Sequence, residues 1–261
     1  ATVALVFGGR THPSATVTGN AESWNGSSWT EISSLNSARY YLAGGVASAT
    51  DAMAFGGYHP PTNSDKTETW DGTSWTERAD LATARRALGG ANKGPTAAGL
   101  AFGGFSTDIQ SLTEEWTTGP SVFSKENVGQ VYYNSTSDAF KVTQRSIANG
   151  TWASGGNMNT QGYALYSLGT QTAAMRAGGY GGPPVGYQAN AETYDGSSWT
   201  AITALGTSRS NEGGAGSGTT TAALVYGGTA PPGRTGNTEE WDSSSWTESG
   251  DLNTVRNQLA G

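Results

Sequence analysis

The chain has 261 residues, of which 35% are hydrophobic and 13% charged, with 39 Gly, 9 Trp and no Cys. The lack of cysteine excludes a disulfide framework and any thiolate metal site or nucleophile. The net charge of −7 argues against binding to nucleic acid, and no apolar run is long enough for membrane insertion. With neither an initiator Met nor a signal peptide, we expect a processed product or an excised portion.

The sequence is a fivefold repeat, marked by Gly-Gly pairs that follow short apolar runs. The pairs begin at Gly8, Gly56, Gly103, Gly178 and Gly227, at steps of 48, 47, 75 and 49 residues. Each pair is followed by a variable polar stretch and then by Glu-x-Trp or Glu-x-Tyr. Four copies have a second Trp five residues later, and four end in Leu-x-(Ser/Thr)-x-Arg. Most of the Trp and much of the Gly therefore occupy repeated positions.

Each copy predicts four short antiparallel strands, named a to d in chain order. In the second copy, strand a covers residues 40–44, strand b 52–55, strand c 67–70 and strand d 74–77. In the first, second and fourth copies, Asn-Gly or Asp-Gly lies between strands c and d, a strong hairpin signal because both residues tolerate positive φ. The two aromatic residues beside that turn are expected to form a cross-strand pair. No helical period of apolar residues is present, so we predict an all-β five-bladed β-propeller.

We expect one domain over residues 1–261, with blade 2 at 39–79, blade 4 at 162–202 and blade 5 at 209–249. Blade 1 combines residues 1–32 with 256–261, because the chain begins in a strand b and ends after a strand a at 257–261. That last strand is expected to complete the first blade and close the ring, which removes an exposed sheet edge.

The long step of 75 residues lies in blade 3, at 85–155, and comes from an insertion at about 117–150 between strands c and d. Residues 129–134 and 138–142 flank Ser-Thr-Ser, which predicts a projecting β-hairpin. A sixth, degenerate blade is the competing interpretation. The hairpin offers four side chains for a contact: Tyr132, Tyr133, Phe140 and Lys141.

This order of motifs resembles the kelch repeat, in which a double glycine ends strand b and aromatic residues lie on strands c and d. The resemblance covers nearly the whole chain outside the insertion and implies a propeller. Segments such as Glu-x-Trp-Asp-Gly-x-Ser-Trp-Thr are similar in sequence to segments of kelch-like proteins of tailed phages, especially marine ones. Residues 129–136 are similar to a segment of phage structural proteins. That similarity implies a virion protein of a tail, fibre or capsid decoration, located on the virion surface.

The repeated acidic and basic residues are interpreted as structural ties within the blades. The set comprises Glu22, Glu68, Glu114, Glu192 and Glu239 with Arg39, Arg85, Arg209 and Arg256. The fourth copy has Gly162 in place of the arginine and carries Arg176 in strand b, which we expect to supply the missing guanidinium to Glu192.

The unrepeated connections between strands b and c are the expected binding surface, because variable loops on a rigid scaffold usually carry recognition. All five are expected on one face of the ring, beside the d–a loops. Their candidate residues are Arg10, His12, Tyr58, His59, Phe105, Tyr180, Tyr187 and Arg234. The two histidines lack clustered carboxylates, so no metal site and no cofactor are expected.

We therefore expect a non-enzymatic binding or structural module. Its expected partners are other virion proteins or a host-surface glycan or protein, with a homo-oligomer within a particle left open. Two alternatives remain. One is a glycan-binding lectin of non-viral origin, which would use a Tyr or Trp face with hydrogen-bonding side chains. The other is a propeller glycosidase or lyase, which would need a pair of acids that converge.

Overall fold

The computed structural model describes residues 4–11, 14–91, 98–118, 131–134, 139–142, 150–216 and 220–258. Every regular element in these residues is a β-strand. The described chain accordingly offers no helix long and apolar enough to cross a bilayer. The all-β class predicted from the repeat is confirmed.

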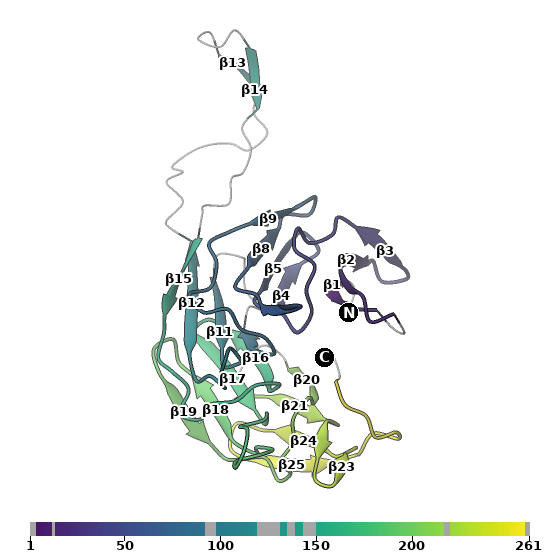
Figure 1. The fold of residues 1–261 in the computed structure, drawn as a ribbon, viewed down its shortest axis with the longest axis vertical. Helices are drawn as coiled ribbons and strands as arrows, with labels where there is room; N and C mark the ends of the chain where they lie inside the picture. Colours follow the sequence, from purple (N-terminus) through teal and green to yellow (C-terminus); the bar gives the residue numbers. More distant parts are fainter. Residues whose placement is uncertain are drawn as a thin grey trace.

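The strands form five antiparallel sheets arranged as the blades of a β-propeller (Figure 1). Blade 1 contains β1 (Ala4–Arg10), β2 (Val17–Trp24) and β3 (Trp29–Ile32). Blade 2 contains β4 (Ala43–Ser48), β5 (Asp51–Phe55), β8 (Thr67–Trp70) and β9 (Trp75–Glu77). Blade 3 contains β10 (Gly89–Ala91), β11 (Ala98–Phe102), β12 (Thr113–Thr118) and β15 (Gly150–Ser154). Blade 4 contains β16 (Tyr166–Thr170), β17 (Ala173–Ala177), β18 (Ala191–Tyr194) and β19 (Trp199–Ile202). Blade 5 contains β20 (Gly213–Gly216), β21 (Ala223–Tyr226), β24 (Thr238–Trp241) and β25 (Trp246–Ser249).

The insertion in blade 3 forms the expected hairpin. Strands β13 (Val131–Asn134) and β14 (Ala139–Val142) pair antiparallel as a separate two-stranded sheet. The insertion joins β12 to β15, which pair with Trp116 opposite Trp152 as the repeat predicts. The structure is therefore a five-bladed ring with an inserted hairpin, and the six-bladed interpretation is wrong.

Strand a begins later than the sequence predicted, at residue 43 rather than 40 in blade 2. The reason is a residue with positive φ two positions before each strand a, which extended backbone cannot include. These residues are Tyr41, Ala87, Ala164, Asn211 and Gln258, with φ between 49° and 56°. The strand a predicted for blade 1 is at 257–261, and residues 259–261 lie outside the described ones. The described part of blade 1 therefore has three strands.

The same five positions link the blades through backbone hydrogen bonds. The amide of Ala87 donates to Tyr41 at 2.8 Å, and Ala164 donates to Ala87 at 2.9 Å. Asn211 donates to Ala164 at 2.9 Å, and Gln258 donates to Asn211 at 2.8 Å. Gln258 therefore occupies the fifth equivalent position, as expected for the C-terminal segment that leads into blade 1.

The core lies between adjacent blades and is built from the repeated aromatic residues. Within each blade, the strand c and strand d rings pair across the turn, as in Trp70–Trp75 with centroids 5.5 Å apart. In blades 2, 3 and 4, the strand d ring also receives a strand b phenylalanine edge-on from the preceding blade. Phe7 contacts Trp75 at 5.0 Å, and Phe102 contacts Trp199 at 4.7 Å. This explains why the ring needs both tryptophans in the repeat.

Candidate functional site

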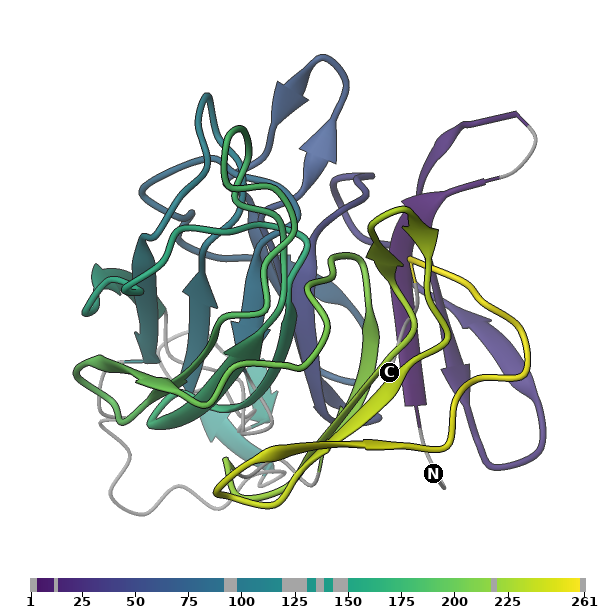
Figure 2. The same cartoon turned by 90° about the horizontal axis from the view of Figure 1, so that it is seen from below.

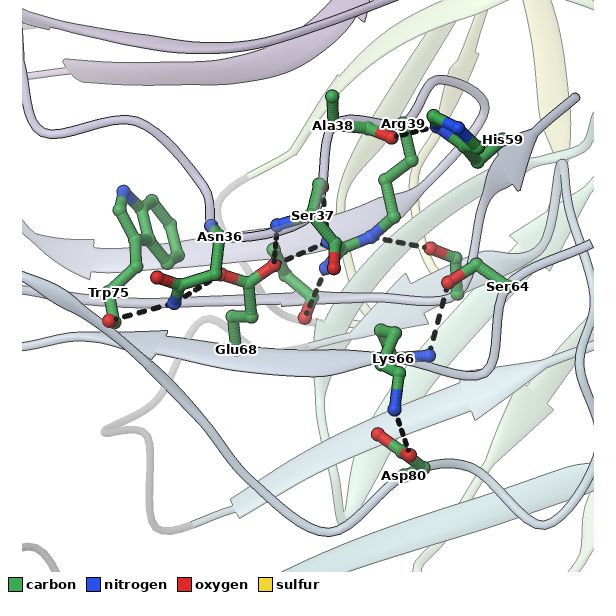
Figure 3. Close-up of polar contacts among 12 residues, drawn as sticks. Asn36, Ser37, Ala38, Arg39, His59, Ser64, Lys66, Glu68, Trp75 and Asp80 are labelled. Carbon is green, nitrogen blue, oxygen red and sulfur yellow. Dashed lines mark hydrogen bonds and ion pairs between the residues drawn. The ribbon is translucent and has the colours of Figure 1, made fainter.

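Repeated Glu and Arg residues form buried ties that hold d–a connections against their blades, as Figure 3 shows for Arg39 and Glu68 of blade 2. Arg39 and Glu68 are fully buried, and Nη1 of Arg39 donates to Oε1 of Glu68 at 2.5 Å. Oε2 of Glu68 accepts the backbone N–H and the side-chain amide of Asn36, at 2.7 and 3.0 Å. The carboxylate thus satisfies backbone donors of the incoming connection as well as the guanidinium.

Four of the five blades contain such an ion pair. The pairs are Arg39–Glu68, Arg85–Glu114, Arg176–Glu192 and Arg209–Glu239. The predicted replacement in blade 4 is confirmed: Arg176 lies directly opposite Glu192 on the neighbouring strand and donates to it from Nε at 3.1 Å and Nη2 at 2.5 Å.

The fifth expected tie, between Glu22 and Arg256, is not formed. Both side chains are exposed, and Nε of Arg256 donates instead to the carbonyl of Thr254 at 3.3 Å. Trp29 of the same blade is 46% exposed, whereas its equivalents Trp75 and Trp199 are 5% exposed. The physical reason is that these residues meet only where the two ends of the chain come together, so no peptide connection holds them in place.

The five b–c loops emerge on one face of the ring, as predicted, and we call this side the loop face (Figure 2). Two of the loops form small hairpins: β6 (Tyr58–His59) with β7 (Thr62–Asn63), and β22 (Thr229–Ala230) with β23 (Gly233–Arg234). In blades 2 to 5, the first residue of the loop also forms an isolated β-bridge with the residue after the repeated arginine position. Tyr40 bridges to Tyr58 in this way, and Arg86 bridges to Phe105.

These bridges assemble a continuous arc of side chains across blades 1 to 4, which we call the aromatic band. Its members are Arg10, Tyr40, Tyr58, Arg86, Phe105, Tyr163, Tyr180 and Tyr187. Residues of b–c loops alternate with residues of d–a loops along most of the arc. Apart from the exposed Arg10, each is half-buried, so the band presents aromatic surface on the loop face.

Arg86 lies at the middle of the band, and its guanidinium carbon is 4.7 Å from the ring centroids of both Tyr58 and Phe105. Nη1 of Arg86 donates to Oδ1 of Asn63 at 2.8 Å, and Asn63 is itself held by the carbonyl of Ser106 at 2.8 Å. Stacking between two rings and this bond fix the plane of the guanidinium. At one end of the band, the guanidinium carbon of Arg10 lies 5.6 Å from the ring centroid of Tyr40.

The other half of the band is a chain of edge-to-face ring contacts. Phe105 and Tyr163 lie 5.9 Å apart, Tyr163 and Tyr180 5.6 Å, and Tyr180 and Tyr187 5.3 Å. Burial raises the pKa of Tyr163, so its hydroxyl is neutral at ordinary pH and available as a hydrogen-bond donor. The rings thus form a pre-ordered surface with hydroxyl groups at their edges.

Blade 5 interrupts the band with small polar residues at the equivalent positions. Ser210 bridges to Thr229 where the other blades pair aromatic or arginine side chains. The side-chain amide of Asn257 donates to the hydroxyl of Thr229 at 2.8 Å. The loop face therefore combines an aromatic arc with a sector of hydroxyl and amide groups.

The remaining candidate residues stay outside the band. His59 is exposed, and its Nδ1 lies 2.8 Å from the carbonyl oxygen of Ala38, while Arg234 is exposed on β23. His12 lies outside the described residues. The four hairpin candidates occupy β13 and β14, where Tyr132 is opposite Lys141 and Tyr133 opposite Phe140.

Sequence reasoning missed the three d–a members of the band, Tyr40, Arg86 and Tyr163. The signal was present, because each follows the repeated arginine position by one residue and varies between copies. It was overlooked because these residues directly follow the Leu-x-(Ser/Thr)-x-Arg motif, which was interpreted as structural. Among the described residues, no group of three or more His, Asp or Glu is placed to hold a metal ion.

No protein-family model matches the chain, and a search of curated proteins finds no significant match. The five-bladed ring is consistent with a kelch-like propeller, and the argument for function depends on the loop face itself.

Proposed function

We propose that the protein is a non-enzymatic binding module that engages a partner through its loop face. The observation that carries this proposal is the aromatic band, a contiguous half-buried surface made of residues that differ between copies of the repeat. A framework role alone would favour the same residue in every blade, as at the Arg–Glu ties. Half-exposed Tyr, Phe and Arg are also the side chains that contribute most to recognition surfaces.

The non-enzymatic part of the proposal is supported by how the repeated acids are used. Glu68, Glu114, Glu192 and Glu239 are buried and bind arginine and backbone donors, so they do not serve as an exposed acid pair. Among the described residues, the one further buried carboxyl is Glu212, which accepts a hydrogen bond from the amide of Tyr166 at 3.2 Å.

We further propose that this module belongs to the surface of a tailed-phage virion, as a kelch-like component of a tail, fibre or decoration. The support is that the sequences of its repeats and of its insertion resemble segments of such proteins. In that setting the ring supplies rigidity, and the loop face contacts another virion protein or the host surface. The hairpin of β13 and β14 is a second contact element in the same proposal.

The test compares three purified proteins on a glycan array and on purified tailed-phage particles. They are the unmodified chain, the double variant Tyr58→Ser/Tyr180→Ser in the band, and the control Thr73→Ala. Thr73 lies in the exposed turn between β8 and β9, away from the loop face. We expect saturable binding to at least one of the two probes, weakened about tenfold or more by the double variant and unchanged by the control.

Three results would overturn the proposal. The first is binding that the double variant leaves intact, although thermal unfolding shows that the variant is folded. The second is cleavage of a bound glycan, which would indicate the glycosidase or lyase alternative. The third is a lack of saturable binding to either probe.

A further inference from the structure

We propose that the aromatic band binds a carboxylate-bearing saccharide, with Arg86 receiving the carboxylate. This inference rests on the proposed binding function and names the ligand class for the same surface. It follows from three features of the loop face: an ordered guanidinium, aromatic surface around it, and a small polar sector on blade 5.

The guanidinium of Arg86 is prepared for an anion. It lies over the rings of both Tyr58 and Phe105, and its N–H donors point outward in its own plane, toward a ligand at its edge. Among the described residues, Asn63 is the one side chain that accepts a hydrogen bond from it, and this bond uses Nη1. The remaining donors match the two oxygens of a carboxylate, and the fixed plane lowers the entropic cost of binding.

The rings on both sides of Arg86 suit a sugar ring. Tyr58, Phe105 and Tyr163 are half-buried and hold each other in place, so they offer apolar surface with little loss of side-chain freedom on binding. A pyranose has an apolar face of C–H groups and an edge of hydroxyl groups. The first fits against aromatic surface, and the second fits the tyrosine hydroxyls around it.

Blade 5 supplies further partners for hydroxyl groups. Thr229 and Asn257 are half-buried and hydrogen-bonded to each other, in the sector where the band is interrupted. Hydroxyl and amide side chains both donate and accept, as sugar hydroxyls do. A saccharide of several units is therefore a better match than a single anion such as phosphate, which would leave the aromatic and amide parts of the surface unused.

The whole chain carries a net charge of −7, but the band itself contains two cationic side chains, Arg10 and Arg86. The b–c loops beside it also carry Asp65 and Asp108, so the attraction of an anion is local to the two guanidinium groups.

The test uses trigalacturonate, a carboxylated trisaccharide, and its fully methyl-esterified form as the neutral control. The two probes share ring shape and hydroxyl groups and differ in the charge of the carboxyl groups. Isothermal titration of the full chain is expected to show saturable binding of trigalacturonate. Binding of the methyl ester is expected to be weaker by about tenfold or more, because the ester cannot form the charge-assisted pair.

Three variants locate the carboxylate. Arg86→Gln and Arg86→Lys are both expected to weaken binding about tenfold, since lysine keeps the charge and loses the planar fork. Arg234→Gln removes the same charge from an exposed loop-face position outside the band and is expected to bind as the unmodified chain does. Thermal unfolding of each variant confirms that the fold is intact, and Arg86→Lys keeps the test informative if Arg86→Gln is unstable.

Equal losses for Arg234→Gln and Arg86→Gln would show diffuse electrostatic attraction and overturn the assignment of Arg86. Equal binding of both trisaccharides would show that the carboxylate is not recognised and would overturn the proposed ligand class. If neither trisaccharide binds while Tyr58→Ser/Tyr180→Ser still abolishes capture of phage particles or of arrayed glycans, the ligand class proposed here is wrong and the binding function stands. If that double variant has no effect on any probe, both proposals fail.

Discussion

At the scale of single residues, the buried Arg–Glu ties are the most sensitive points of the framework. Glu68 accepts from the Arg39 guanidinium and from backbone N–H groups of the incoming connection, so loss of its charge leaves several buried donors poorly paired. Removal of one partner of such a buried pair typically costs about 3–5 kcal/mol.

The first prediction compares equivalent glutamates in two blades. Glu68→Gln is expected to lower the free energy of unfolding by about 3–5 kcal/mol, because Arg39 stays buried without its counter-charge. Glu22→Gln is expected to change it by less than about 0.5 kcal/mol, because Glu22 is exposed and unpaired with Arg256. Urea unfolding measures both. A large loss for Glu22→Gln would show that the fifth tie forms in solution.

A second residue-scale feature is Glu212, which occupies a position where the other blades have leucine. Its Cβ lies near Gly228 in the way that the Cβ of Leu42 lies near Gly57. The carboxyl is buried, and desolvation raises its pKa to about 8, although Arg209 and Arg176 act in the opposite direction. Oε2 of Glu212 has no hydrogen-bond partner among the described residues. The folded state therefore favours the protonated acid.

The second prediction is a loss of stability with rising pH that depends on Glu212. Because the folded pKa lies above the ordinary value of 4.5, the folded chain binds this proton more tightly, and stability falls as pH rises from about 4.5 to about 8. Glu212→Gln is expected to match the wild-type chain near pH 5 and to exceed it by several kcal/mol near pH 9. Urea unfolding at both pH values tests this, with the exposed Glu248→Gln as control. Parallel profiles for Glu212→Gln and the wild-type chain would contradict it.

At the scale of elements, the insertion is separable from the blade that carries it. Strands β12 and β15 keep the register of the other c–d pairs, with Trp116 opposite Trp152 at 5.5 Å between ring centroids. In blade 2 the equivalent pair is joined by Asp-Gly-Thr-Ser, in which Oδ1 of Asp71 accepts the amides of Thr73 and Ser74 at 2.8 Å. The same turn can connect β12 to β15 directly.

The third prediction follows from that register. Replacement of residues 117–151 by Asp-Gly-Thr-Ser is expected to leave the propeller folded, with a melting temperature within a few degrees of the full chain. Circular dichroism and calorimetry measure this outcome. The shortened chain should also bind trigalacturonate normally, because the band lies on the other end of the blades. If the shortened chain no longer unfolds cooperatively, the insertion is part of the core.

At the scale of the whole molecule, the sequence predicted the architecture better than it predicted the junction of the ring. Strands b to d were predictable because apolar runs, Gly-Gly pairs and Asp-Gly turns act locally. Strand a begins later than predicted because Tyr41 and Ala87 have positive φ, and neither residue type indicates positive φ in a sequence. The tie between Glu22 and Arg256 was wrongly predicted because the repeat pattern assigns the same contacts to every copy. Only this interface lacks a peptide connection.

The last prediction concerns that junction. Residues 257–258 hold the end of the chain to blade 5 through the side chain of Asn257 on Thr229 and the amide of Gln258 on Asn211. Removal of residues 257–261 deletes the fifth position in the series of interblade hydrogen bonds. We expect a melting temperature lower by several degrees and faster amide exchange in β20 and β21, with exchange in β10 and β11 unchanged. Hydrogen-exchange mass spectrometry makes the comparison within one molecule. Uniform exchange across the four strands, before and after removal, would show that the terminal segment contributes nothing to the ring.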